Sequence, residues 1–422
     1  MNELPIHKRE FHAFLSHAYT DKVIVDRINS WLSEVAGVPI WYDARYLQAS
    51  AQIATELPKA IIQCRAMIII LSKTSVTRGW VREEYEFAIG QRTRFKDFRI
   101  VPVRIEECEV PGFLETTRWI DLRNGNLDLE TANELLISLY YDDAAIESGK
   151  TRDIYVSRTW RESEAFLADY VSKLVDKAGF RLIGDSKDQA GFNEGDRIKS
   201  IISSCGGLVA ILPDRGQGIT SEYMLKEIKL AQDLCIPCLI VAESTVKLSD
   251  DLAKIAILMQ VDEAKNGGSA ILQTGIEKLM EDWKKPNHPH YIFFATDFNV
   301  ENNQRNLVIK QLIQSVTAMT CIMGDKLREG EVQKVITETI SRSFMMIADI
   351  SEDNLNTLIE AGIARGANKK FHLIGRAPRR SPPFMFRDQQ VWHYADNIEL
   401  LGVIHRIAYL YRRRVLNYEL PK

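Results

Sequence analysis

The stretch AMIIILSKTSVTRGWVREEYEFAI, residues 66–89, joins an apolar run to a polar loop and then to an amphipathic segment. The run AMIIIL (66–71), followed by polar residues, is typical of a buried β-strand. After Gly79 the apolar side chains recur with the period of an α-helix. A strand, a loop and a helix in this order form the repeating unit of a parallel α/β sheet.

The same unit recurs twice more along the chain, as GLVAILPDRGQGITSEYMLKEIKLA (207–231) and FMMIADISEDNLNTLIEAGIA (344–364). Another strand–loop–helix segment precedes each copy, at 11–32, 152–175 and 290–313. Equivalent residues recur at a nearly constant spacing: Ser16 with Ser157, Asp43 with Asp185, Cys64 with Cys205, and Glu84 with Glu227. Such internal repetition predicts an α/β fold of three tandem flavodoxin-like domains, each a parallel sheet flanked by helices.

Two segments between the repeats are candidate domain joints. YYDDAAIESGKTRD (140–153) is polar around Ser148, and KKPNHPH (284–290) combines proline with polar residues around Pro286. We therefore predict domains at 1–148, 149–286 and 287–422.

The overall composition excludes several classes of protein. The chain is 45 % hydrophobic and 26 % charged with a net charge of -3, which predicts neither direct nucleic-acid binding nor membrane attachment. No apolar run reaches the length of a membrane span or a secretory signal, so a cytoplasmic location is expected. The six cysteines are scattered, and Cys235 and Cys238 have no second ligand pair nearby, so no metal site is predicted.

Glu84 is the unusual residue in the opening stretch. On a helical wheel it falls within the arc formed by Val81, Tyr85, Phe87 and other apolar residues, whereas Glu83 and Glu86 fall on the polar side. One interpretation is a carboxylate that serves the helix dipole or caps a loop. The other is a functional carboxylate in a cleft.

The first third of the chain resembles a Toll/interleukin-1 receptor (TIR) domain. The resemblance covers residues 11 to about 105. It is carried by FHAFLSHAYTD at the first strand, by WYDARYLQAS and IATELPKAI in the second-loop region, by IIILSKTSV, and by the Trp-Val-Arg-Glu-Glu sequence that begins at Trp80.

TIR domains that cleave NAD+ have an aromatic residue followed four places later by a catalytic glutamate, so the resemblance implies that Glu84 is catalytic. It implies NAD+ as a substrate, with no resident cofactor, and ADP-ribose or a cyclic form of it as product. Nicotinamide leaves as a neutral molecule, so one carboxylate beside the developing positive charge suffices, unlike in glycoside hydrolysis. The substrate-binding residues that it implies are Phe14, Ser16, His17, Asp43 and Trp80.

The middle third is a weaker TIR-like copy. Tyr223 and Glu227 repeat the four-residue spacing, but the loops SRTWRES and PDRGQGITS lack the rest of the pattern. We expect a degenerate, non-catalytic domain.

The last third resembles nucleoside 2-deoxyribosyltransferase-like folds through ADISEDNLNTLIEAGIARGANKKFHLIG (348–375). The resemblance implies nucleotide binding, and we expect this domain to sense a ligand. Arginines after the next strand suit a phosphate, although a solvated basic loop is the alternative. The expected ligand-sensing residues are Asp349, Asn354, Asn356, Glu360, Arg376, Arg379 and Arg380.

Two functional classes remain open. The first is an NAD+-cleaving effector, similar to those of prokaryotic antiphage immunity, that a nucleotide signal activates through the C-terminal domains and self-association. The second is a non-catalytic interaction protein whose TIR-like domain only assembles with other TIR proteins.

Overall fold

The computed structural model describes residues 4, 6, 9–42, 53–77, 79–140, 153–184, 194–260, 270–285, 290–324, 332–351, 354–378, 382–416, 418 and 420. Three five-stranded sheets follow one another along the chain, with the orders β2-β1-β3-β4-β5, β10-β9-β8-β6-β7 and β12-β11-β13-β14-β15. Numbered within each domain, all three orders are 2-1-3-4-5, the flavodoxin-like arrangement. The predicted fold class is confirmed.

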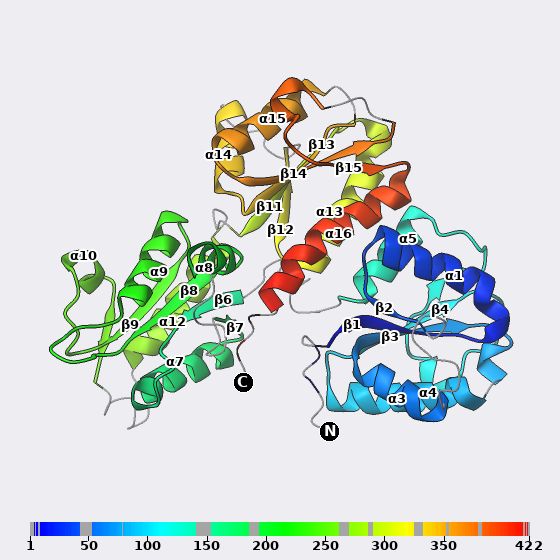
Figure 1. Cartoon of the computed structure of the whole chain (residues 1–422), viewed down its shortest axis with the longest axis horizontal. Helices are drawn as coiled ribbons and strands as arrows, with labels where there is room; N and C mark the ends of the chain where they lie inside the picture. The colour runs from blue at the N-terminus through cyan, green and yellow to red at the C-terminus, as the bar shows by residue number, and fades with distance from the viewer. Residues whose placement is uncertain are drawn as a thin grey trace. The chain divides into compact units, whose positions relative to one another are not determined.

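The first sheet is parallel, with Ala13 of β1 paired to Ile40 of β2 and to Ala66 of β3. Helices α1 and α5 lie on one face of it and α3 and α4 on the other (Figure 1). The strands are β1 (Phe11–Ser16), β2 (Ile40–Trp41), β3 (Cys64–Leu71), β4 (Arg99–Arg104) and β5 (Ile120–Asp121). The helices are α1 (Lys22–Ser30), which continues as a π-helical turn (Trp31–Val35), α3 (Ile53–Ile62), α4 (Gly79–Arg94) and α5 (Leu129–Ser138).

The second sheet repeats this plan, and the side chains of its strands alternate between two apolar cores. Ile154 and Val209 point into one core, whereas Tyr155 and Leu208 point into the other. A parallel sheet covered on both faces needs such continuous apolar strands. The strands are β6 (Asp153–Ser157), β7 (Arg181–Ile183), β8 (Gly207–Leu212), β9 (Cys238–Glu243) and β10 (Ile257–Met259). The helices are α7 (Ala165–Lys177), α8 (Glu194–Ser203), α9 (Glu222–Asp233), α10 (Asp250–Ala253) and α12 (Ala270–Lys284).

The third sheet differs mainly in its long last helix, α16 (Asn397–Leu416), which contributes buried side chains along most of its length. The strands are β11 (Tyr291–Ala295), β12 (Thr320–Met323), β13 (Met345–Asp349), β14 (Lys370–Arg376) and β15 (Val391–Tyr394). The other helices are α13 (Asn303–Thr317), α14 (Val332–Arg342) and α15 (Leu355–Gly366).

The chain groups into two compact units. One contains Met1–Gly149, Phe294–Thr337 and Met346–Leu410, and the other contains Lys150–Phe293, Glu338–Met345 and Tyr411–Lys422. The first unit therefore joins the first sheet to most of the third domain. Both predicted domain joints fall largely on residues 141–152 and 286–289, outside the described residues.

Within the first unit, α16 packs against the segment that follows α1. His405 is fully buried, and its two ring nitrogens lie 2.6 Å from the carbonyl oxygen of Ala36 and 2.6 Å from the hydroxyl of Tyr140. Burial lowers the pKa of His405 to about 4, so the ring is neutral. Because a carbonyl can only accept, Nδ1 donates to Ala36 and Nε2 accepts from Tyr140.

A glycine in α16 permits this close approach. A Cβ atom on Gly402 would lie 2.6 Å from Val35 Cγ1 and 3.2 Å from the backbone nitrogen of Ala36. Real Cβ atoms do not approach neighbours so closely, so any larger residue would push α16 away from this surface.

Candidate functional site

The carboxyl ends of β1 and β3 meet where the strand order of the first sheet reverses. In open parallel sheets ligands bind outside such a switch point. Two loops leave the sheet here, and they are tied together because Ser72 Oγ, after β3, donates to Asp21 Oδ2 at 2.6 Å. The loop after β3 leads into α4, which carries Glu84.

Glu84 turns toward this edge of the sheet. Ser16, the last residue of β1, donates from Oγ to Glu84 Oε2 at 2.6 Å. Glu84 is 8 % exposed and Ser16 is 1 % exposed. By contrast, Glu83 and Glu86 are exposed, and Glu86 pairs with Arg82 on the helix surface at 3.0 Å. Glu84 is thus buried at the switch point and bonded to a strand residue, whereas Glu83 and Glu86 lie on the solvated face of α4.

His17 follows Ser16 and is largely buried at the same edge. Its ring centroid lies 5.3 Å from that of Tyr42, the residue after β2. Tyr42 in turn donates from its hydroxyl to Asp26 on α1 and accepts from Lys22. Sequence reasoning missed Tyr42, Asp26 and Lys22, because polar residues on a helix and one tyrosine after a strand give no signal on their own.

Phe14 lies in the core rather than at the surface. It is 2 % exposed and stacks on Trp41, with ring centroids 4.9 Å apart and planes inclined by 14°. It supports β1 beneath Ser16 and has no open face for a ligand. Asp43 and the side chain of Trp80 lie outside what the structure describes.

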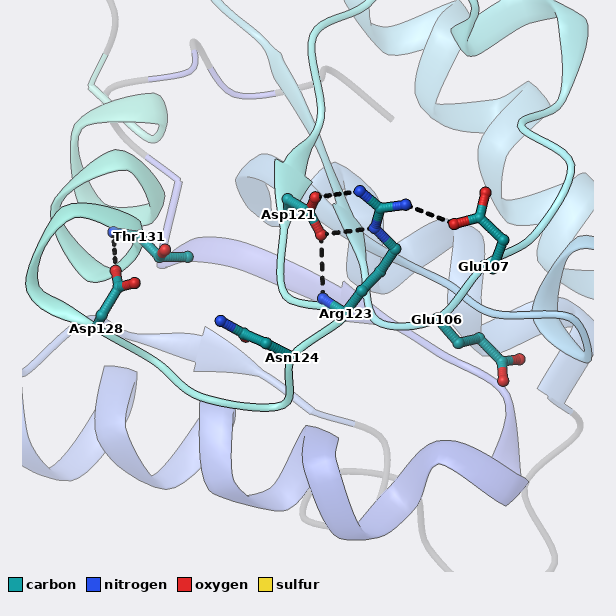
Figure 2. A pocket seen from close by; sticks show the side chains of 7 residues that line it. All are labelled: Glu106, Glu107, Asp121, Arg123, Asn124, Asp128 and Thr131. Carbon is teal, nitrogen blue, oxygen red and sulfur yellow. Dashed lines mark hydrogen bonds and ion pairs between the residues drawn. The ribbon is translucent and has the colours of Figure 1, made fainter.

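A shallow polar pocket lies beside the ends of β4 and β5, and it contains neither Ser16 nor Glu84 (Figure 2). Its polar groups satisfy one another. Arg123 lies between two carboxylates, binding Asp121 at 2.9 Å and 2.5 Å and Glu107 at 2.5 Å. The hydrogen bonds from Arg123 lower the pKa of Asp121 to about 2. Asp128 caps α5 through the backbone nitrogen of Thr131. We therefore interpret this pocket as a paired surface network rather than as a site.

The second domain repeats the hydroxyl–carboxylate pair. Ser157, the last residue of β6, donates to Glu227 Oε2 at 2.5 Å, and Tyr155 donates to Glu227 Oε1 at 2.6 Å. The spacing of the sequence matches Ser157 and Glu227 to Ser16 and Glu84, but it gives no sign of the contribution of Tyr155. Hydroxyl groups therefore donate to both oxygens of Glu227.

In the third domain, Asp349 ends β13 and is the centre of a hydrogen-bond network. Tyr394 of β15 donates to its Oδ2 at 2.9 Å, and Arg305 of α13 lies 3.8 Å away. Arg305 also donates to Thr296 at the end of β11, at 3.0 Å. Sequence reasoning found Asp349 but missed Arg305 and Tyr394, which come from distant segments.

The other expected sensing residues are spread around this edge. Asn354 caps α15 by accepting from the backbone nitrogen of Asn356, which is itself exposed. Arg376 has an exposed side chain, and its backbone nitrogen donates to Ser351. Arg379 and Arg380 lie outside the described residues.

Glu360 differs from these residues because its carboxyl group is half-buried on α15. An ideal Cβ atom on Gly324 would lie 3.5 Å from Glu360 Oε1 and 3.8 Å from the ring of Phe298. Burial raises the pKa of Glu360 to about 7. A carboxyl group in this state can accept from a ligand or donate to it near neutral pH.

No helix in the described ranges is long and apolar enough to cross a membrane. Within the same ranges, no cluster of three or more His, Cys, Asp or Glu side chains is arranged to hold a metal ion.

Two solved structures give distant likenesses. The TIR domain of the Toll-related receptor TRR-2 from Hydra magnipapillata is 17 % identical, with a TM-score of 0.28, and the match covers 31 % of this chain and 100 % of that one. The C-terminal domain of glucosamine-fructose-6-phosphate aminotransferase from Francisella tularensis is 10 % identical with a TM-score of 0.21, covering 69 % of this chain and 95 % of that one. A comparison with curated protein sequences found no match.

The family comparison is more specific. The model of the TIR domain family matches residues 13–136, a range that contains β1, the Ser16–Glu84 pair and α5. Residues 13–136 of this chain therefore form a TIR domain.

Proposed function

We propose that this chain is a TIR-type NAD+ glycohydrolase that releases nicotinamide from NAD+. The observation that carries the proposal is the buried Glu84 carboxylate, fixed by Ser16 at the switch point of a TIR domain. The product is ADP-ribose, or a cyclic form of it if a nitrogen of the adenine attacks in place of water.

The chemistry requires little beyond this carboxylate. As the bond from ribose C1′ to the pyridinium nitrogen breaks, its electron pair leaves with nicotinamide, and positive charge develops on the ribose. In this proposal the carboxylate of Glu84 stabilises that charge, and its hydrogen bond to Ser16 keeps it oriented before the substrate binds. Water then adds to C1′ and gives up a proton, so that one NAD+ and one water yield nicotinamide, ADP-ribose and H+.

The test is nicotinamide release from NAD+ by the purified full chain. Glu84→Gln keeps the shape of the side chain and removes its charge, so turnover should fall at least roughly 100-fold, the effect of losing one preorganised electrostatic group. Glu86→Gln, on the exposed face of the same helix, is the matched control and should retain turnover. Near-full activity of Glu84→Gln would show that the catalytic assignment is wrong.

The third domain supplies the regulation in this proposal, as the sensor of a nucleotide signal produced during phage infection of a prokaryotic cell. The Arg305–Asp349–Tyr394 network and Glu360 place polar groups at the carboxyl edge of its sheet. The chain exists in an inactive state and a self-associated, active state. A ligand that binds the active state more tightly shifts the population toward it. The cytoplasm is the compartment in which such an effector meets NAD+.

The sensor is tested on the full chain, because part of the third domain packs on the TIR domain through α16. Cyclic oligonucleotides and ADP-ribose derivatives are titrated by calorimetry, and nicotinamide release is measured in parallel. Arg379→Ala together with Arg380→Ala should weaken binding of any activator, while Arg387→Ala, at an exposed position of the same domain, should not. If the double variant binds the activator as tightly as Arg387→Ala does, the sensor lies in another part of the chain.

A non-catalytic assembly role is the alternative, because a TIR domain that only associates with others would show the same fold. It predicts no Glu84-dependent nicotinamide release under any condition, together with concentration-dependent self-association that Glu84→Gln leaves intact.

A further inference from the structure

Tyr42 is anchored to α1 by a charged pair. Its hydroxyl donates to Asp26 Oδ1 at 2.6 Å and accepts from Lys22 Nζ at 3.1 Å. Lys22 and Asp26, four residues apart on the helix, also contact each other at 3.2 Å. A phenol has one proton to donate, and here it is given to a carboxylate while the oxygen accepts from an ammonium. The three groups therefore fix the orientation of the ring.

The protonation states needed for this anchor are the stable ones. The hydrogen bond from Tyr42, followed by the contacts with Lys22, lowers the pKa of Asp26. The bond to Tyr42 and then that to Asp26 raise the pKa of Lys22. Burial, and then the bond to Asp26, raises the pKa of Tyr42. A neutral phenol between two charged groups consequently persists across the neutral pH range.

The anchored ring lies against the site. Tyr42 and His17 have ring centroids 5.3 Å apart, with planes inclined by 38°. His17 directly follows Ser16, which holds Glu84. Tyr42 is only 3 % exposed, so it has almost no surface for a ligand, and it packs against His17, which is 9 % exposed.

We propose that Tyr42 is a positioning residue for NAD+ binding: anchored by Asp26 and Lys22, its ring fixes the imidazole of His17 beside the Ser16–Glu84 pair. The inference rests on the proposed NAD+ cleavage. Glu84 is held separately by Ser16, so loosening Tyr42 affects how tightly the substrate is bound rather than how fast the bond breaks. Such a change raises KM and leaves kcat nearly unchanged, because it removes binding that is equal in the ground and transition states.

The first experiment compares the full chain with Tyr42→Phe, which removes only the hydroxyl. We expect KM for NAD+ to rise about 5-fold or more, with kcat within about 2-fold. Asp26→Asn should shift KM in the same direction. Tyr170→Phe in the second domain is a matched hydroxyl deletion and should change neither value. A purely structural role of Tyr42 would instead lower the active fraction, and thus the apparent kcat, at unchanged KM.

A double-mutant cycle tests whether Tyr42 acts through His17. If it does, Tyr42→Phe should add almost nothing to the KM of His17→Ala, because residues that act as a unit are not additive. An unchanged KM in Tyr42→Phe, or full additivity with His17→Ala, would overturn the inference.

A binding arm separates this inference from the proposed function. In the Glu84→Gln background, calorimetry gives the Kd of NAD+ without turnover, and adding Tyr42→Phe should raise that Kd by the same factor as KM. A chain that binds NAD+ but never cleaves it refutes the glycohydrolase while the Kd ratio still decides the role of Tyr42. A chain that neither binds nor cleaves NAD+ refutes both.

Discussion

Ser16 and Glu84 lie 68 residues apart in the sequence and are joined by a 2.6 Å hydrogen bond in the structure. One ends the first strand of the sheet and the other lies on the helix after the third strand, so the flavodoxin-like strand order brings them together. The bond joins a hydroxyl to a carboxylate at the switch point, the edge at which parallel sheets of this kind bind ligands. The first prediction follows from it.

Ser16→Ala should lower kcat/KM for NAD+ by about 10-fold or more. A hydrogen bond to a charged group contributes about 1.5–3 kcal/mol, and its loss leaves Glu84 less well oriented. Ser16→Thr keeps the hydroxyl and should recover part of the activity. Steady-state nicotinamide release measures these changes. A kcat/KM of Ser16→Ala within 2-fold of the parent would show that the bond between Ser16 and Glu84 is not needed.

The equivalent carboxylate of the second domain has a different environment. Both oxygens of Glu227 accept from hydroxyls, because Tyr155 lies two residues before Ser157 on β6. The corresponding residue in the TIR domain is Phe14, two before Ser16, which has no hydroxyl to offer. Glu227 is thus held by a strand tyrosine that the TIR domain does not have at this position.

Glu227→Gln should therefore leave NAD+ turnover within a few-fold of the parent. It should instead reduce stability, because hydrogen bonds to a charged carboxylate are replaced by weaker ones to a neutral amide. Thermal unfolding and nicotinamide release are measured on the same preparation. Turnover lost as completely as in Glu84→Gln would show a second functional site.

The periodic parts of the molecule could be predicted from sequence. Apolar runs such as residues 66–71 and the helical spacing around Glu84 led to three parallel sheets in the order in which they occur. The wheel also placed Glu84 on the buried side of α4. These features depend on local patterns that one sequence displays in full.

Contacts between distant segments could not be predicted in this way. Tyr42 gains its role from Asp26 and His17, and Arg305 from Asp349, only after the chain has folded. Gly402 in a long helix looks like a mild destabilising residue, yet it permits the close approach to Val35. Neither hydrophobic period nor residue type indicates such partners.

His405 makes the stability of the chain depend on pH. Its folded pKa of about 4 lies below the usual value of 6.5, so the unfolded chain binds more protons between these values. Its contribution is complete above pH 6.5 and is lost as the pH falls toward 4, by about 3 kcal/mol at 1.36 kcal/mol per pKa unit.

His405→Gln is the sharpest test of this effect, because glutamine does not titrate and can still donate to Ala36 and accept from Tyr140. Its thermal midpoint should fall less steeply than that of the parent between pH 6.5 and pH 4. Parallel slopes for the two chains would mean that His405 titrates normally and that the contact with Ala36 is not buried in solution.

Glu360 should have the opposite dependence. Burial raises its folded pKa to about 7 from 4.5, so the folded chain holds a proton that the unfolded chain has lost. Stability therefore falls as the pH rises from 4.5 through 7, and above 7 the ionised carboxylate costs about 3 kcal/mol at 1.36 kcal/mol per pKa unit. Glu360→Gln should stabilise the chain at pH 8 and have little effect at pH 4. Glu338→Gln, at an exposed position, should change the free energy of unfolding at neither pH 8 nor pH 4.

The same substitution also tests whether this carboxyl group serves the sensor. A half-buried carboxyl group on α15 beside Phe298 and Gly324, with a pKa raised by burial, is a candidate ligand-binding group. Glu360→Gln should accordingly raise the thermal midpoint at pH 8 while weakening the binding of an activating nucleotide to the full chain. Denaturation curves at pH 4 and pH 8, with calorimetry of the same variant, separate the two effects. If Glu360→Gln is stabilised at pH 8 but binds the activator as well as the parent does, Glu360 lies outside the sensing site. If Glu360→Gln is not stabilised at pH 8, the carboxyl group of Glu360 is solvated in the folded chain.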